Sequence, residues 1–141
     1  MHMKATTYAV RIDLAVTPEE VLFVREEKDH SKLEIWTLCL SQALCVVSAR
    51  EEESGKLLGI GFLVGNQRHG NIVDLSVHSS VRKAGLGGQI LDRLVKHAKE
   101  LEITYLGLTY DQRSPWLKDF YYRHGFRLID FAMWEEGSLP G

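Results

Sequence analysis

Three glycines and two cations lie close together in the run Arg82-Lys83-Ala84-Gly85-Leu86-Gly87-Gly88. Glycine permits positive φ and a close approach of the backbone to a ligand. From Gln89 the apolar residues recur at helical spacing, so the run opens a helix. The first N–H groups of a helix lack intrahelical partners and lie at the positive end of its dipole. The run therefore suits a phosphate or pyrophosphate, and the alternative is an ordinary strand-to-helix loop with glycines for tight packing.

The same residues exclude two familiar phosphate loops. A Walker loop requires Gly-Lys-Ser or Gly-Lys-Thr, and neither follows these glycines. The dinucleotide fingerprint requires a third glycine at a fixed spacing after Gly85-Leu86-Gly87, and it is absent. A Rossmann domain is also excluded, because a run of consecutive strands precedes the motif.

Hydrophobic periodicity predicts the elements that position this run. Strands are expected over residues 7–14, 43–50, 56–64, 71–78, 104–109 and 126–134. Helices are expected after the capping box of Thr17-Pro18-Glu19-Glu20, over 33–40, from Gln89, and from Ser114-Pro115 to about His124. Short turns between successive strands indicate an antiparallel meander, and a strand that follows a helix can lie parallel to the strand before it. The predicted class is α+β, with a mixed, mostly antiparallel sheet of about six to seven strands and about four flanking helices.

Length and composition narrow the class of protein. With 141 residues, the chain (residues 1–141) is expected to form a single domain, and a net charge of −2 gives no basic excess for nucleic acid. No apolar run approaches the ~20 residues of a membrane helix, so no membrane partner is expected. Cys39 and Cys45 lack metal-ligand spacing and are expected to be small buried apolar residues. No metal site is expected, and the predicted location is cytoplasmic.

Two motifs resemble those of the GNAT superfamily of acetyl-CoA-dependent N-acetyltransferases. The family's Arg/Gln-x-x-Gly-x-Gly/Ala is present as Arg82-Lys83-Ala84-Gly85-Leu86-Gly87, after Asp74-Leu75-Ser76-Val77-His78, which is similar to the family's Leu-x-Val strand ending. Its Phe-Tyr-x-x-x-Gly-Phe element is present as Phe120-Tyr121-Tyr122-Arg123-His124-Gly125-Phe126. A helix, a strand and a helix start separate the motifs, as in the family. The resemblance covers about residues 44–134 and implies a GNAT-like fold with a β-α-β acyl-CoA-binding core.

The resemblance implies a role for each matching residue. The CoA pyrophosphate would be held by backbone N–H groups of Arg82, Lys83, Ala84, Gly85, Leu86, Gly87 and Gly88. Leu75 and Val77 would present backbone groups to the pantetheine arm and the thioester carbonyl, where the sheet splays open. Tyr121 would contact CoA and protonate the departing thiolate. Ser114 stands where many members have an asparagine that contacts CoA, and it also suits a helix N-cap.

The implied reaction is attack of an amine on a thioester. Only the neutral amine is nucleophilic, and a lysine-like amine is neutral in roughly one molecule per thousand at neutral pH. Asp74 is the first candidate for the base or amine anchor, because some polyamine-acetylating members carry an acid at this place. It is expected to share a strand face with Ser76 and Ile72. The alternatives are a salt-bridged structural Asp74, with His78 or a water chain as the base.

The leading prediction is an acyltransferase that moves an acetyl group from acetyl-CoA, its cosubstrate, to a primary amine of a small molecule or peptide. A catalytically inactive acyl-CoA-binding sensor or interaction domain is second, because Ser114 departs from the pattern and Asn71 stands where histone-type members have a glutamate base. A mixed-sheet nucleotide binder is third. The strand over 126–134 is a candidate edge for a homodimer.

Overall fold

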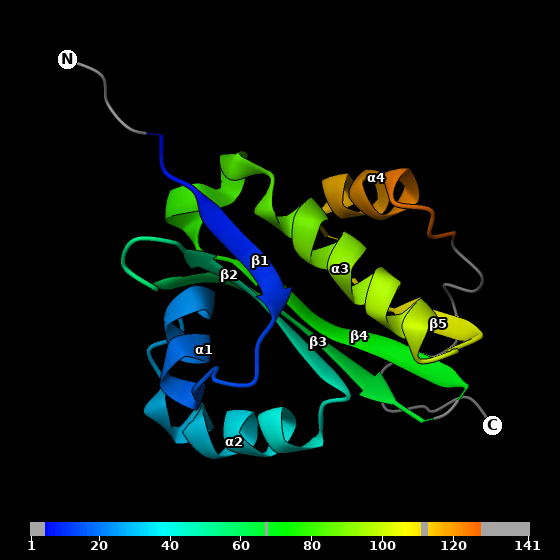
Figure 1. Cartoon of the computed structure of the whole chain (residues 1–141), viewed down its shortest axis with the longest axis horizontal. Coiled ribbons are helices and arrows are strands. Elements are labelled where there is room, and N and C mark those ends of the chain that lie inside the picture. Colours follow the sequence, from blue (N-terminus) through cyan, green and yellow to red (C-terminus); the bar gives the residue numbers. More distant parts are fainter. Residues whose placement is uncertain (1–4, 67, 111–112, 128–141) are drawn as a thin grey trace. The chain divides into compact units, whose positions relative to one another are not determined.

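The computed structural model describes residues 5–66, 68–110 and 113–127, which belong to two compact units. The N-terminal unit, up to Thr109, contains ten elements in the following order: β1 (Tyr8–Ile12), α1 (Pro18–Arg25), the 3-10 helix η1 (His30–Lys32), α2 (Leu33–Gln42), β2 (Cys45–Glu51), β3 (Leu57–Gly65), β4 (His69–Val77), the 3-10 helix η2 (Ser79–Ala84), α3 (Leu86–Glu100) and β5 (Tyr105–Leu108) (Figure 1). The C-terminal unit, from Tyr110, contains α4 (Pro115–Arg123). Within these described ranges, none of the helices has the length and apolarity needed to cross a bilayer.

A five-stranded sheet forms the centre of the N-terminal unit, in the order β1-β2-β3-β4-β5. Neighbouring strands from β1 to β4 are antiparallel, and β5 runs parallel to β4 after the crossover through α3. The predicted α+β class, the meander and the β-α-β unit are therefore confirmed. The described sheet has fewer strands than predicted. Phe126 and Arg127, at the start of the last predicted strand, are not in a strand, and residues 128–134 lie outside the described residues.

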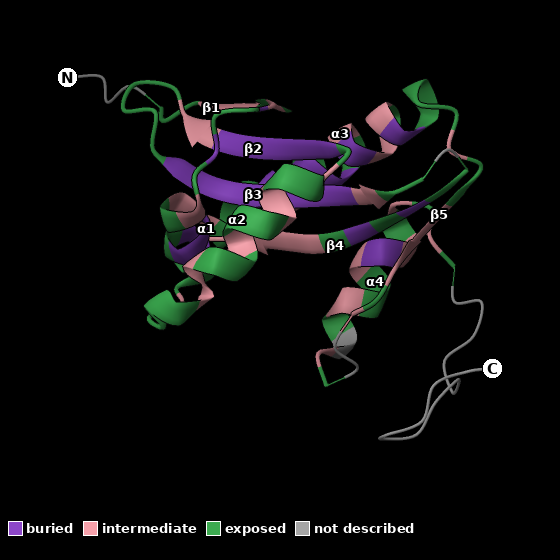
Figure 2. Ribbon diagram, turned by 90° about the horizontal axis from the view of Figure 1, so that it is seen from below, coloured by how far each residue is buried: buried purple, intermediate pink, exposed green. Residues whose placement is uncertain are grey.

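α3 packs on one face of the sheet, and α1 and α2 pack on the other. Facing α3, β3 carries Gly59 and Gly61, where a Cβ would lie 2.7 Å from Ile90 Cδ1 and 2.7 Å from Leu94 Cδ1 respectively. These glycines therefore permit the close approach of α3. The opposite face holds a buried cluster of Val16, Val21, Val24, Val46, Leu57, Ile60 and Phe62, with Trp36 of α2 packed against it. Figure 2 shows that burial is concentrated in β2 and β3.

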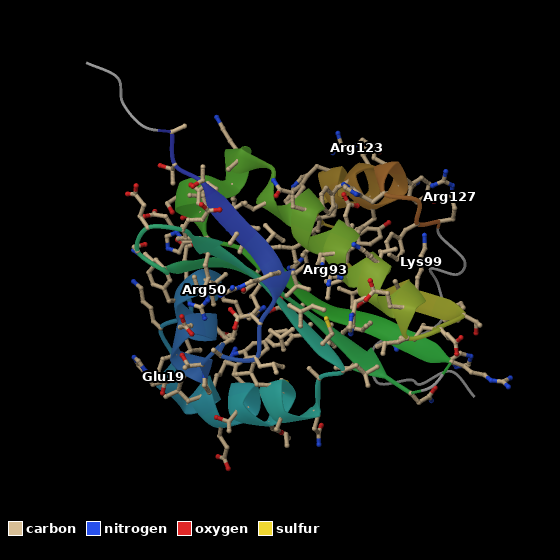
Figure 3. The ribbon with its side chains drawn as sticks, in the orientation of Figure 1. Glu19, Arg50, Arg93, Lys99, Arg123 and Arg127 are labelled. Carbon is tan, nitrogen blue, oxygen red and sulfur yellow. The ribbon has the colours of Figure 1, made fainter. Side chains whose placement is uncertain are left out.

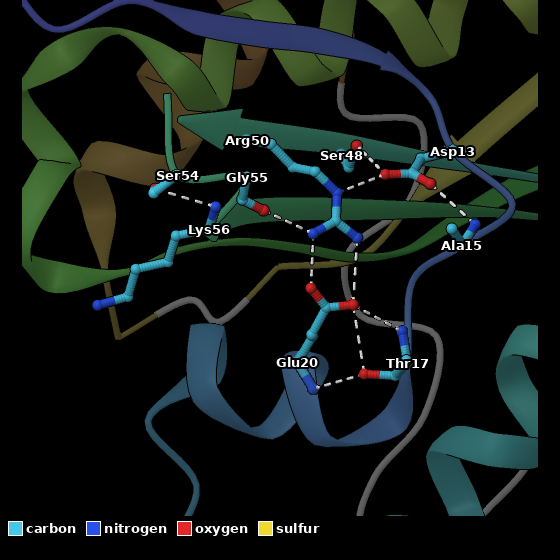
Figure 4. A network of polar contacts seen from close by, with 9 residues as sticks. All are labelled: Asp13, Ala15, Thr17, Glu20, Ser48, Arg50, Ser54, Gly55 and Lys56. Carbon is cyan, nitrogen blue, oxygen red and sulfur yellow. Dashed lines mark hydrogen bonds and ion pairs between the residues drawn. The ribbon is translucent and has the colours of Figure 1, made fainter. Parts of the chain in front are cut away.

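A cluster of charged side chains fixes the start of α1 against β1 and β2. The predicted capping box is present, since the Glu20 N–H donates to Thr17 Oγ1 and the Thr17 N–H donates to Glu20 Oε1. Arg50 of β2 (Figure 3) donates from Nη1 to Glu20 Oε2 at 2.6 Å and from Nε to Asp13 Oδ2 at 2.7 Å. Ser48 Oγ donates to the same Asp13 oxygen (Figure 4). Arg50 is thus the shared cation of two carboxylates from separate segments.

The ionisation of these carboxylates depends on Arg50. Burial raises the pKa of Asp13, but hydrogen bonds from Arg50, Ser48 and the Ala15 N–H outweigh it, so that this pKa lies below its usual value. The hydrogen bond from Arg50 is the largest cause that lowers the pKa of Glu20. A carboxyl group with a lowered folded-state pKa stabilises the fold above its unfolded pKa, at about 4. Its contribution is lost as the pH falls through the folded-state pKa.

Replacement of Arg50 by methionine should lower the free energy of unfolding by about 3 kcal/mol near neutral pH, because it leaves a buried carboxylate without its cation. The difference from the wild type should shrink as the pH falls from about 4 and both carboxylates become protonated. Urea denaturation over a pH series measures this. Arg11→Met, at an exposed position of β1, is the matched control. A loss that stays equal at acid and neutral pH would contradict the assigned ion pairs.

The two cysteines lie in different environments. Cys45 on β2 is buried, as predicted, and Cys39 on α2 is half-buried. Burial raises the pKa of the Cys45 thiol to about 11, so this side chain is a neutral thiol at physiological pH. Cys45 therefore acts as a small apolar residue of the core.

Candidate functional site

β4 loses its parallel neighbour partway along its length. Its pairing with β5 begins at His69 and Tyr105 and ends at Ile72 and Leu108, whereas β4 itself continues to Val77 (Figure 2). In the part of the chain that the structure describes, residues 73–77 therefore have β3 on one edge and no strand on the other. Main-chain N–H and C=O groups on such an edge are available to an extended ligand. The resemblance to the GNAT superfamily implies that the sheet splays open here.

A shift in the β3–β4 register sets the direction of the side chains at this point. Leu63 pairs with Ile72, but its neighbour Phe62 pairs with Asp74, so β4 contains one extra residue. Paired residues share a face, and consecutive residues of β3 face opposite sides. Ile72 and Asp74 therefore lie on opposite faces, and the prediction that they share a face is wrong. The prediction that Asp74 shares its face with Ser76 is confirmed, because the two side chains are hydrogen bonded.

Asp74 lies on the face covered by α1 and α2, where two donors reach one of its oxygens. Arg25 Nη1 and Ser76 Oγ each donate to Asp74 Oδ1 at 2.8 Å. The Asp74 side chain is only 9% exposed, and its Oδ2 is buried with no hydrogen-bond partner among the described residues. Burial raises the pKa of Asp74, and Arg25, Ser76 and the Leu75 N–H offset this only in part. A buried carboxyl group with a raised pKa and an unmet oxygen is typical of functional sites.

Arg25, the last residue of α1, is held by α2 as well as by Asp74. Its guanidinium carbon lies 4.8 Å from the centre of the Trp36 ring, and its Nε donates to Glu27 Oε2 at 3.4 Å. Glu27 in turn accepts hydrogen bonds from Lys32 Nζ at 2.6 Å and Trp36 Nε1 at 3.2 Å. These contacts orient the guanidinium toward Asp74. Sequence reasoning missed Arg25, whose position at a helix end suggests only a favourable interaction with the helix dipole.

The glycine run forms a left-handed residue followed directly by a helix. Gly85 has φ 75° and ψ 14°, and α3 begins at Leu86 rather than at the predicted Gln89. No side chain caps α3. The Gln89 N–H donates a hydrogen bond to the Gly85 carbonyl. The N–H groups of Leu86, Gly87 and Gly88 therefore have no side-chain cap and lie at the positive end of the dipole. This arrangement fits the predicted anion site.

The side chains around the turn are arranged by Glu26, which follows α1. Arg82 is 67% exposed, and its Nη2 lies 3.7 Å from Glu26 Oε2. Lys83 is exposed. The His78 Nδ1 accepts a hydrogen bond from the Ser80 N–H and caps η2, while its Nε2 lies 3.5 Å from Glu26 Oε1. One ring nitrogen of His78 thus has its partner in η2, and the other lies beside Glu26 at the end of α1.

The C-terminal unit carries Tyr121 and Ser114. Tyr121 lies on α4 and is buried, with ring centroids 5.8 Å from Tyr110, 5.1 Å from Phe120 and 6.1 Å from Phe126. Aromatic packing therefore fixes its ring within this unit. Ser114 occupies the N-cap position of α4, as predicted, but its side chain makes no capping hydrogen bond. In neither unit do the described residues group three or more potential metal ligands.

The chain belongs to the GNAT acetyltransferase family, because the model of that family matches residues 10–126. Its members are acyltransferases that use acetyl-CoA as cosubstrate. No curated protein matches the chain.

Solved structures with a similar fold include other acetyltransferases. A GNAT family protein from Streptococcus pneumoniae is 20% identical with a TM-score of 0.75, over 94% of this chain and 100% of that one. A GNAT acetyltransferase from Elizabethkingia anophelis with acetyl-CoA bound is 19% identical with a TM-score of 0.71, over 92% and 90%. Glucosamine-6-phosphate N-acetyltransferase from Arabidopsis thaliana is 20% identical with a TM-score of 0.65, over 94% and 99%. At these identities the likeness shows the fold alone.

Substitutions of Gly85 test the geometry of the turn. The left-handed conformation costs a residue with a Cβ about 1–2 kcal/mol, and asparagine tolerates it better than alanine. Because a Cβ at Gly85 would meet no atom within 4 Å, strain is the only local penalty. Gly85→Ala should therefore lower the free energy of unfolding by about 1 kcal/mol, and Gly85→Asn by less. Urea denaturation measures both, and two unchanged stabilities would be incompatible with a left-handed residue here.

Proposed function

We propose that the protein is an N-acetyltransferase that transfers the acetyl group of acetyl-CoA to a primary amine of a small molecule or peptide. Family membership accounts for acetyl transfer. The observation that carries the choice of an amine is Asp74, a buried carboxyl group with one unmet oxygen on the part of β4 that has no β5 partner. A carboxylate at this place can bind an ammonium group and take up its proton, directly or through a neighbouring group. The fold is also that of a named N-acetyltransferase from Arabidopsis thaliana.

Two features of the segment from β4 to α3 fit acetyl-CoA. The edge over residues 73–77, which pairs with no strand of the described chain, offers main-chain groups, including those of Leu75 and Val77, to an extended arm that contains amides. The uncapped start of α3 fits a pyrophosphate, which the backbone of residues 82–88 would hold beside the exposed Arg82 and Lys83. When bound, acetyl-CoA supplies the thioester. A main-chain N–H of the open β4 edge would stabilise the negative charge that develops on the carbonyl oxygen.

In the proposed reaction Asp74 accepts a proton from the acceptor and Tyr121 donates one to the leaving group. Asp74 receives a proton from the ammonium group, and the nitrogen lone pair forms the new C–N bond as the C–S bond breaks. Tyr121 donates its hydroxyl proton to the departing sulfur. The nitrogen, once bonded to the acetyl carbon, loses its second proton to solvent, and Tyr121 regains a proton from solvent. Ser114 supplies a cosubstrate contact in place of the family's asparagine. The family match spans parts of both units, which supports the proposal that they act as one domain. The free thiols of Cys39 and Cys45 agree with a reducing compartment, the cytoplasm.

A thiol-release assay with acetyl-CoA tests the proposal. The acceptor panel contains polyamines, aminoglycosides, arylalkylamines and peptides with a free N-terminus. Thiol is expected only when an amine that the protein accepts is present. Binding of acetyl-CoA in calorimetry, with no release across the whole panel, would instead favour a catalytically inactive acyl-CoA-binding domain.

Asp74→Asn should lower kcat/KM for the amine by about 10²–10⁴-fold, because the amide cannot take up the proton. The affinity for acetyl-CoA, measured by calorimetry, should not change. Asp92→Asn, at an exposed position of α3, is the matched control and should retain wild-type kinetics. Wild-type turnover in Asp74→Asn would exclude it as the base.

Tyr121→Phe keeps the buried ring and removes only the hydroxyl, so the aromatic packing of α4 should be preserved. We expect kcat to fall by about 10²-fold or more, because the leaving sulfur loses its acid. Steady-state kinetics with a saturating amine measure this. Turnover equal to that of the wild type would contradict the proposed role of the hydroxyl.

A further inference from the structure

We propose that Ser76 is a further catalytic residue, which passes the proton of the acceptor ammonium group to Asp74, and that Arg25 positions Asp74 to receive it. This inference rests on the proposed N-acetyl transfer and specifies the route of the proton. A route is required because Asp74 Oδ2 has less than 1 Å² of exposed surface, and Oδ1 already accepts two hydrogen bonds. An acceptor nitrogen therefore does not reach either oxygen directly in this arrangement.

The Ser76 hydroxyl is the neighbouring group that connects Asp74 to the open part of the strand. Its Oγ lies 2.8 Å from Asp74 Oδ1 and donates to it. Ser76 is half-buried and lies between Leu75 and Val77, in the stretch of β4 for which the described residues provide no strand partner other than β3. A serine oxygen that donates its hydrogen keeps two lone pairs as acceptors. It can therefore accept a hydrogen bond from an ammonium group while it donates to Asp74.

Arg25 sets the direction of this hydrogen bond. A single nitrogen, Nη1, lies 2.8 Å from Asp74 Oδ1 and 3.5 Å from Ser76 Oγ, so the guanidinium faces both oxygens. Because a guanidinium group can only donate hydrogen bonds, Asp74 Oδ1 and Ser76 Oγ both act as acceptors toward Arg25. The Ser76 hydroxyl hydrogen therefore points at Asp74 Oδ1. In this arrangement Asp74, the base, orients the Ser76 hydroxyl, the relay group, and Arg25 orients Asp74.

Among the described residues, the charged group in contact with Asp74 is the guanidinium of Arg25. Glu27 contacts the far side of the guanidinium at Nε, and on β3 the apolar Phe62 pairs with Asp74. Burial has the largest effect on the pKa of Asp74 and raises it. The charge of Arg25 has the largest effect in the opposite direction. Without that charge the carboxyl group would be protonated up to a higher pH and could accept no proton there.

The proposed step moves one proton and balances without another reagent. The N–H bond of the ammonium group breaks, and its electron pair stays on nitrogen as the lone pair. That proton passes to Ser76 Oγ as the serine's own proton passes to Asp74 Oδ1. The amine, Ser76 and Asp74 are then all neutral, and the amine can attack the thioester. Asp74 returns its proton to solvent after the product leaves.

Ser76→Ala tests the relay. We expect kcat to fall by about 10-fold to 10²-fold with unchanged affinity for acetyl-CoA, whereas Ser76→Thr, which keeps a hydroxyl, should retain most of the activity. A combined Ser76→Ala and Asp74→Asn variant should be no slower than Asp74→Asn alone, because both residues act on one path. Ser41→Ala, at an exposed position of α2, is the matched control.

Arg25→Met tests the positioning role. The acidic limb of the pH profile of kcat/KM should move to higher pH, and carbon NMR of the Asp74 carboxyl should show the same shift without turnover. Arg25→Lys keeps the charge and should shift less, and it replaces Arg25→Met if that variant does not fold. An unchanged Asp74 titration in both variants overturns the role of Arg25.

The outcomes separate the two proposals. If the wild-type protein acetylates no amine, the proposed function and the relay both fall. If it does, full activity in Ser76→Ala together with a slow Asp74→Asn overturns the relay alone.

Discussion

The site depends on one constraint in β4. The register between β4 and β3 shifts at the point where the pairing of β4 with β5 ends. The last β5 pair is Ile72 with Leu108, and the extra residue in β4 follows immediately. Among the described residues, one edge of residues 73–77 then has no strand beside it, and such an edge can bind an extended ligand. The extra residue turns Asp74 onto the face covered by α1 and α2. In the proposed function, the backbone groups that hold the cosubstrate and the carboxyl group that serves the acceptor thus come from the same short segment of strand.

The second requirement is a fixed α1. At its start, Arg50 joins Glu20 of the capping box to Asp13, and at its end Arg25 reaches Asp74. The first set of contacts is structural, because its charges satisfy one another. The second is incomplete, because Asp74 Oδ2 has no partner among the described residues. One short helix therefore links an interaction that stabilises the fold to the group that we propose takes up the proton.

Local patterns made much of this predictable. The capping box, the meander and the helix start at the glycine run each depend on residues that are near one another in sequence, and the structure confirms these three elements. The start of α3 was misplaced because glycine disfavours helix interiors, although at the first turn it leaves N–H groups accessible. The face of Ile72 was wrong because strict alternation contains no sign of a β-bulge. Arg25 and Ser76 were missed because their contacts with Asp74 depend on the placement of α1 and on that bulge.

In the proposed function, the edge of β4 over residues 73–77 and the start of α3 hold acetyl-CoA. Amide NMR spectra of the isotopically labelled protein, titrated with acetyl-CoA, test it most directly. The predicted result is that the largest shifts occur at Leu75, Val77, Gly87 and Gly88, while β1 residues such as Val10 stay unchanged. Saturable binding that leaves those four amides unperturbed would contradict the claim.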